Sequence, residues 1–186
     1  MPIQVYSFYI FDRHTECIYS KTWVQPALPS SSSNNLTSPP PSRPQSQQPP
    51  AHAPGHASTT PTSGAPIVQS AAARRRSDDD AKLIFGTVFS LRNMVRKLGG
   101  DDDAFIAYRT AQYKLHYYET PTNLRFALLT EPGALSMRNV LHQIYINLWV
   151  EYVVKNPLSP VEHKGGAGVR NEMFEMGLDK FIRGLM

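Results

Sequence analysis

The segment from Ile3 to Phe11 constrains the fold more than any other part of the chain. It reads as a strand, and its residues are apolar on both faces, apart from Gln4 and Ser7. One face carries Ile3, Val5, Tyr9 and Phe11, and the other carries Tyr6, Phe8 and Ile10. A strand of this kind must be covered above and below, so it belongs inside a sheet that has helices on both sides. The polar residues 12–14 end it, and Glu16 to Trp23 reads as a second strand, which predicts an N-terminal hairpin.

A Pro/Ser-rich segment interrupts the chain after this hairpin. Of the 16 prolines, 11 lie between Pro26 and Pro66, and most of the apolar residues around them are alanine. Such a composition cannot bury enough surface to offset the entropy lost on ordering. We therefore expect residues 24–76 to form a disordered insertion. Residues 1–23 plus 77–186 then make one domain of ordinary size.

The net charge of +4 is located in this insertion. Residues 24–76 hold four arginines and no acidic residue, so the rest of the chain has 15 basic and 15 acidic side chains. A basic stripe on a folded surface would indicate nucleic-acid binding, but this sequence places its excess charge elsewhere. We expect no nucleic-acid partner.

The next predicted element is an amphipathic helix. Ser77 or Asp78 suits its N-terminal cap, and the helix is expected to run to about Leu98, before Gly99 and Gly100. Apolar residues at spacings of four and three predict the stripe that faces the core. The stripe consists of Ile84, Val88, Leu91, Val95 and Leu98.

The remaining elements complete a recognisable order. Strands are predicted at 105–110, 113–120 and 124–130, and short turns make them an antiparallel meander. Helices are predicted at 136–154 and 171–184. The order β-β-α-β-β-β-α-α favours the α+β class: a longin-like five-stranded antiparallel sheet with one helix on one face and two on the other.

The sequence contains no recognisable motif for catalysis, metal binding or phosphate binding. The six histidines are scattered without metal-ligand spacing, and the glycines at 165–168 lack the lysine of a phosphate loop. The single cysteine, Cys17, permits no intrachain disulfide and favours a reducing compartment. No apolar run is long enough to span a membrane. We expect a cytoplasmic chain that is not an enzyme, with no catalytic residue, metal or cofactor.

Five segments carry a resemblance to a known family. They are residues 7–14 (SFYIFDRH), 79–86 (DDAKLIFG), 89–92 (FSLR), 113–117 (YKLHY) and 155–160 (KNPLSP). Their sequence and order strongly resemble the smallest longin-type subunits of the TRAPP vesicle-tethering complex. The resemblance covers essentially all of the predicted folded part, and the long insertion is a departure from it.

The resemblance implies a role in vesicle transport from the endoplasmic reticulum to the Golgi. The expected partners are other TRAPP-like subunits, including a second longin-type subunit, and a Rab-family GTPase that binds the assembled complex. The chain would be a non-catalytic part of the platform that promotes nucleotide exchange. It would lie in the cytoplasm, peripheral to the cis-Golgi and endoplasmic reticulum, and meet membrane only indirectly.

Four residues of the first helix are the candidate partner-binding site. Lys82, Phe85, Phe89 and Arg92 lie beside the predicted core stripe and inside the matched motifs. Aromatic residues and arginine are enriched at protein interfaces, although a wide core face would explain them equally well. The alternatives to a TRAPP-like subunit are a small subunit of an adaptor complex, a longin-domain SNARE, another trafficking module of the same fold, or an enzyme of similar topology.

One further motif stands at the end of the insertion. The sequence Arg74-Arg75-Arg76-Ser77 is similar to the sites that basophilic kinases modify. A phosphate on Ser77 would be favoured electrostatically at a helix start. An unmodified linker end is the simpler reading.

Overall fold

The computed structural model describes residues 2–24, 71–100, 103–163 and 168–186. Most of the predicted insertion, residues 25–70, lies outside the described residues. The strands are β1 (Val5–Phe11), β2 (Cys17–Thr22), β3 (Ala107–Arg109), β4 (Lys114–Glu119) and β5 (Arg125–Thr130). The helices are α1 (Ala71–Gly99), α2 (Arg138–Ile144), η1 (Tyr145–Val154) and α3 (Glu172–Arg183). This order confirms the predicted one.

The five strands form one antiparallel sheet in the order β2-β1-β5-β4-β3. The N-terminal hairpin therefore joins the meander through the pairing of β1 with β5. All seven residues of β1 are buried. The α+β class and the interior position of β1 are both confirmed.

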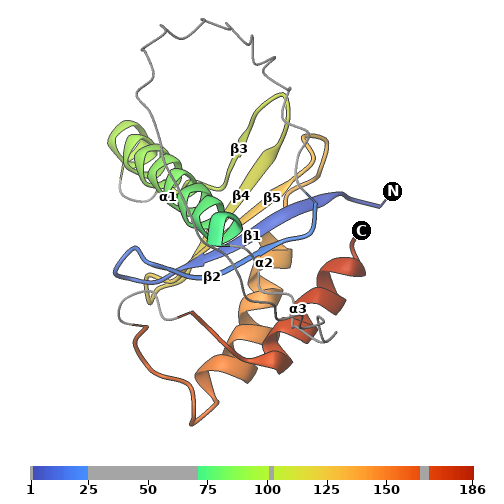
Figure 1. Cartoon of the computed structure of the whole chain (residues 1–186). Coiled ribbons are helices and arrows are strands. Elements are labelled where there is room, and N and C mark those ends of the chain that lie inside the picture. Colours follow the sequence, from blue (N-terminus) through green and yellow to red (C-terminus); the bar gives the residue numbers. More distant parts are fainter. Residues whose placement is uncertain (1, 25–70, 101–102, 164–167) are drawn as a thin grey trace, which may run out of the picture. The chain divides into compact units, whose positions relative to one another are not determined.

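Helices cover both faces of the sheet, α1 on one and α2, η1 and α3 on the other (Figure 1). Each face has its own core. Under α1 the buried residues include Tyr9, Phe11 and Tyr117, while on the opposite face Phe8, Phe126 and the α2–α3 residues pack together. The predicted arrangement of one helix against two is confirmed.

The predicted faces of β1 need one correction. Val5 belongs to the core on the α2–α3 face together with Phe8 and Ile10, and Tyr6 belongs to the α1 face with Tyr9. The register with β5 shifts between Val5 and Ser7. Because such a bulge inserts one residue, every side chain before it changes face. A strict alternation could not show this.

Two predictions for α1 were wrong. One is the residue at which the helix begins, and the other is part of the stripe that faces the core. The helix begins at Ala71, so Ser77 and Asp78 lie within it and do not cap it. Leu98, predicted to face the core, is 82% exposed, whereas Ala81 and Val88 are buried. Leu98 lies in the last turn of α1, on a side of the helix that faces solvent.

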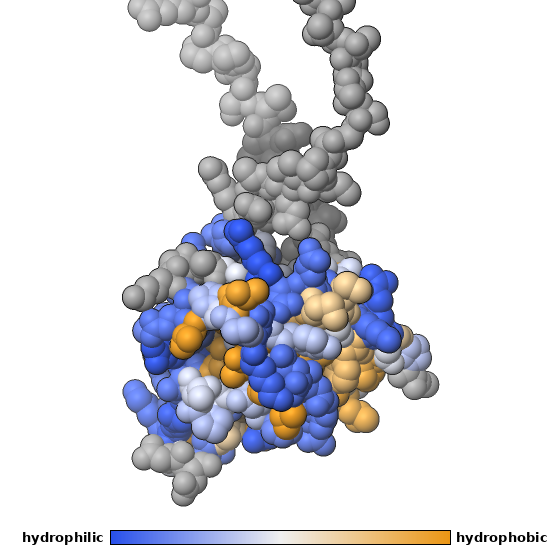
Figure 2. Space-filling view, turned by 90° about the horizontal axis from the view of Figure 1, so that it is seen from below, coloured by the Kyte–Doolittle hydropathy of each residue, from blue (hydrophilic) through white to orange (hydrophobic). Residues whose placement is uncertain are grey.

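The second helical layer matches its predicted bounds closely. α2 continues directly into η1, where the backbone follows the wider π geometry and Lys155 N donates to the carbonyl of Val150 at 3.0 Å. Asn171 caps α3, since its side chain accepts hydrogen bonds from the amides of Met173 and Phe174. Seen from below, the described surface is mainly hydrophilic and is interrupted by separate hydrophobic areas (Figure 2).

Candidate functional site

Helix α1 presents the predicted partner-binding residues on one flank. Ala81 and Val88, two turns apart, anchor the helix to the sheet with exposed fractions of 3% each. Residues that follow them by one position point along the side of the helix, because each residue turns the helix by about 100°. Lys82 and Phe89 occupy those positions. We call the set Lys82, Phe85, Phe89 and Arg92 the Phe89 flank.

The aromatic residues of the Phe89 flank are stacked on the sheet. The Phe85 ring lies 5.3 Å from the ring of Phe11 at the end of β1, and the Phe89 ring stacks on Phe85 at 6.0 Å. Phe85 is half-buried, while Phe89 remains 49% exposed. Phe85 therefore belongs to the edge of the core and supports the outer ring of Phe89 from below.

Lys82 is the other solvent-facing member of the flank. Its side chain is 78% exposed, and its ammonium lies 3.8 Å from the carboxylate of Asp79. Such an exposed pair on one helix contributes little to stability, so the ammonium can change partners. Lys82 and Phe89 can contact another protein directly.

Arg92 is held inside the domain. Its Nε and Nη2 donate to the two carboxylate oxygens of Glu119 on β4 at 2.6 and 3.0 Å. Arg125 of β5 donates to the same carboxylate at 3.4 Å and also to the backbone carbonyl of Asp12 at 3.2 Å. The Arg125 guanidinium lies 5.8 Å from the centre of the Phe85 ring, a cation–π contact.

These contacts divide the predicted site. Phe89 and Lys82 face solvent, while Phe85 and Arg92 hold their flank of α1 on strands β1, β4 and β5. Glu119 was missed by sequence reasoning, although it is the carboxylate that joins Arg92 to Arg125. Its sequence signal is an acid at the end of one predicted strand of the meander, close to Arg125 at the start of the next.

A second set of exposed apolar residues lies on the opposite flank of α1. Leu83 is 71% exposed, Met94 is 49% exposed and Leu98 is 82% exposed. The spacings of 11 and four place them on one side of the helix. We call these three residues the Leu83 flank. Sequence reasoning missed it because it assigned Leu98 to the core, and a helical wheel centred on Ala81 and Val88 would have found it.

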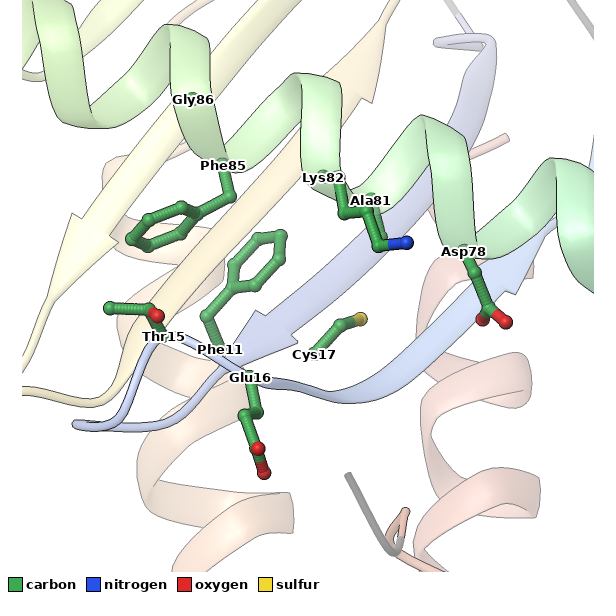
Figure 3. A pocket seen from close by; sticks show the side chains of 9 residues that line it. All are labelled: Phe11, Thr15, Glu16, Cys17, Asp78, Ala81, Lys82, Phe85 and Gly86. Carbon is green, nitrogen blue, oxygen red and sulfur yellow. The ribbon is translucent and has the colours of Figure 1, made fainter. Parts of the chain in front are cut away.

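A cavity of about 540 Å³ opens between α1 and the β1–β2 hairpin. Phe11 and Phe85 turn their rings toward each other at one side, and the thiol of Cys17 lies at the other (Figure 3). Ala81 and Lys82 line it from the helix, and Thr15 and Glu16 from the hairpin turn. Thr15 has a φ of 73°, in the left-handed region, which closes the turn tightly.

The Cys17 thiol in this cavity is not suited to nucleophilic chemistry. Burial raises its pKa to about 11, and the backbone carbonyl of Tyr19 accepts a hydrogen bond from Sγ at 3.4 Å. Since the thiolate is the reactive form, a thiol with this pKa is almost wholly protonated at neutral pH. Cys17 acts as a small apolar strand residue here.

A buried histidine lies on the other face of the sheet. His116 is 1% exposed, its Nε2 shares a hydrogen bond with the Thr130 hydroxyl at 3.0 Å, and its Nδ1 accepts one from the amide of Met137 at 3.4 Å. Burial, with a smaller effect of Lys114, lowers the pKa of His116 to about 4. The neutral ring joins β4 to the start of α2 and has a structural role.

The described residues contain neither a candidate metal site nor a membrane-spanning helix. No group of three or more histidine, cysteine, aspartate or glutamate side chains there could hold a metal ion. Within the same ranges, no helix is long and apolar enough to cross a membrane.

The fold and the matched segments now define the family. Residues 5–185 match the Sybindin-like family, and the chain belongs to this family, with a longin-like α+β fold. It is 53% identical over 108 residues to the transport protein particle subunit bet5 of Schizosaccharomyces pombe, a match that covers 56% of this chain and 68% of the relative.

Two other relatives extend the comparison. The trafficking protein particle complex subunit BET5 of Saccharomyces cerevisiae is 30% identical over 178 residues, 95% of this chain and 86% of the relative. The human trafficking protein particle complex subunit 1 is 46% identical over 106 residues, 56% of this chain and 70% of the relative. The resemblance seen in the sequence motifs is thereby confirmed.

Proposed function

We propose that this chain is a non-catalytic scaffold subunit of a TRAPP-type tethering particle. The observation that carries the proposal is the family match over residues 5–185, together with relatives that bear the names of trafficking particle subunits. A subunit that works by assembly needs exposed apolar surface on a rigid support. Helix α1 offers such surface on both of its flanks.

The Phe89 flank is the proposed partner-binding site. Phe89 offers a half-exposed ring on a fixed base, and energetic anchors of interfaces are commonly aromatic residues and arginine. In this proposal Lys82 and Phe89 contact the partner. Phe85 and Arg92 keep the flank in place through Phe11 and Glu119. The partner is another subunit of related fold, whose own apolar helix would cover α1.

The finer role is promotion of nucleotide exchange on a Rab-family GTPase in transport from the endoplasmic reticulum to the Golgi. An exchange assembly works by binding the nucleotide-free GTPase more tightly than the nucleotide-bound one. This differential binding requires surface and no acid, base or nucleophile. In this proposal the chain is cytoplasmic and lies at the two membranes through the assembled particle.

Reconstitution of the particle from purified subunits tests the proposal. Phe89→Asp places a charge at the centre of the interface and should abolish incorporation of the chain, measured by size-exclusion chromatography and pull-down. Ile146→Asp is the matched control, because Ile146 is a 43% exposed apolar residue on η1 in the other layer. That variant should assemble normally, and both should keep the circular dichroism of the native chain.

A nucleotide-exchange assay distinguishes the scaffold role from the finer role in promoting exchange. Release of a fluorescent nucleotide from the GTPase should fall with Phe89→Asp in step with the loss of assembly. If both variants assemble and promote exchange like the native chain, the Phe89 flank is not an interface. If the native chain enters no particle with TRAPP-type subunits, the scaffold role itself is wrong.

A further inference from the structure

The N-terminal part of α1 carries two opposite charge triplets in succession. Arginines occupy positions 74–76, and aspartates occupy positions 78–80, with Ser77 between them. The helix begins at Ala71, so the arginines fall in its first two turns, and its first turn contains no acidic residue. The positive end of the helix dipole disfavours cations there and favours acids. The charge order thus opposes the observed start.

A start at Ser77 would suit the same sequence better in electrostatic terms. Serine is a preferred N-cap residue, and the three aspartates would then occupy the first three helical positions. The observed start instead gains from the three alanines at 71–73, since alanine has the highest helix propensity. The chain therefore encodes two competing starts for α1, at Ala71 and at Ser77.

The contacts of Ser77 make a change between these starts feasible. Its hydroxyl lies 3.3 Å from the hydroxyl of Ser20 on β2, in an exposed hydrogen bond. From Ser77 onward, the first buried side chain of the helix is Ala81. Among the side chains described from Ser77 onward, packing on the sheet thus holds α1 from Ala81, one turn after Ser77.

We propose that Ser77 is a phosphorylation site for a basophilic kinase and that the phosphate moves the start of α1 from Ala71 to Ser77. Kinases select substrates by charge pattern, and arginines two and three positions before the acceptor serine match an acidic substrate groove. The kinase transfers the γ-phosphoryl group of ATP to Oγ of Ser77. The bond from the γ-phosphorus to the bridging oxygen breaks, ADP leaves, and the hydroxyl proton passes through the base of the kinase to solvent.

The two starts respond differently to the phosphate. Within the longer helix, phosphoserine would lie one turn from Asp80, and like charges at this spacing destabilise a helix. At the cap of the shorter helix, its oxygens would accept hydrogen bonds from free backbone amides beside the positive end of the dipole. The modification therefore favours the shorter helix. This inference does not depend on the proposed role in a tethering particle.

The experiment treats the full chain with the catalytic subunit of cyclic-AMP-dependent protein kinase and ATP. Peptide mapping should find one phosphoryl group on Ser77. Backbone NMR should show loss of helical chemical shifts at 71–76, while Ala81 to Val95 keep theirs. Ser77→Ala and the double substitution Arg74→Ala with Arg75→Ala should abolish the modification. The control Ser90→Ala, an exposed serine of the same helix, should leave it unchanged.

Two outcomes would overturn the proposal. A chain that remains unmodified at Ser77 in the native form, while a peptide of residues 71–80 is phosphorylated, would show that the folded helix protects the site. A chain that is phosphorylated at Ser77 but keeps helical shifts at 71–76 would show that the phosphate does not select the helix start.

Discussion

The two helical layers attach to the same sheet in different ways. The layer of α2, η1 and α3 is anchored by large side chains that are fully buried, among them Phe174, Leu178 and Leu141. Among its described side chains, from Ser77 onward, α1 buries only Ala81 and Val88, and it relies on half-buried rings and the carboxylate of Glu119. Burial of large apolar groups dominates stability. We infer that one layer determines the stability of the domain while the other provides surface for partners.

The largest expected effect comes from emptying the core of the α2–α3 layer. Phe174 is fully buried, and its ring meets those of Tyr19 and Trp149 at 5.2 and 5.8 Å. Phe174→Ala should lower the free energy of unfolding by about 3–5 kcal/mol. Chemical unfolding followed by circular dichroism measures it. The control Met176→Ala, at a 68% exposed position of α3, should change it by less than about 0.5 kcal/mol.

The same layer should also be sensitive to acid. His116 stays neutral in the folded protein down to a pKa of about 4, whereas in the unfolded chain it takes up a proton below about pH 6.5. Stability is therefore lost as the pH falls from about 6.5 to about 4, by about 3 kcal/mol in total.

Substitution isolates this effect. His116→Asn should remove this part of the pH dependence, as measured by unfolding at pH 7 and pH 4. If the native chain and the variant lose equal stability over that range, another group is responsible. A loss confined to the native chain would show that protonation of His116 weakens the attachment of α2 to the sheet. The attachments of α2 and α1 would then differ in their response to pH.

A smaller effect is expected at the attachment of α1. Glu119→Gln leaves the guanidinium groups of Arg92 and Arg125 without their carboxylate, at exposed fractions of 16% and 14%. The loss should be about 1–3 kcal/mol, with faster amide hydrogen exchange in α1 than in α3. Asp79→Asn, which removes an exposed pair with Lys82, is the control and should have almost no effect. Equal exchange in both helices would contradict the proposed difference between the layers.

The sequence predicted most of the fold because local patterns determine most of it. The alternation in β4 and β5 and the capping by Asn171 are readable from neighbouring residues. The faces of Val5 and Tyr6 were misplaced because a bulge depends on the pairing with β5. The start of α1 at Ala71 was missed because the cap signals at Ser77 and Asp78 were locally the stronger ones.

The candidate site was predictable only in part. The positions of Lys82 and Phe89 outside the core follow from helical periodicity, and the structure agrees. The pairing of Arg92 with Glu119 joins residues 27 positions apart, and the contact of Arg125 with Asp12 joins residues 113 apart. Contacts of this range depend on the assembled sheet, so no single-helix pattern could show them.

One hydrogen bond of the fold has a consequence for protein engineering. The amide of Ile3 donates to the carbonyl of Leu185 at 3.0 Å. The chain just before the first strand therefore lies beside the chain just after the last helix. A short glycine linker could join these ends, and new termini could be opened between Val24 and Ala71. In that circular permutant α1 would come first and the β1–β2 hairpin last, with the strand pairings of the described residues unchanged. The domain could then carry a fluorescent or affinity module at the new termini.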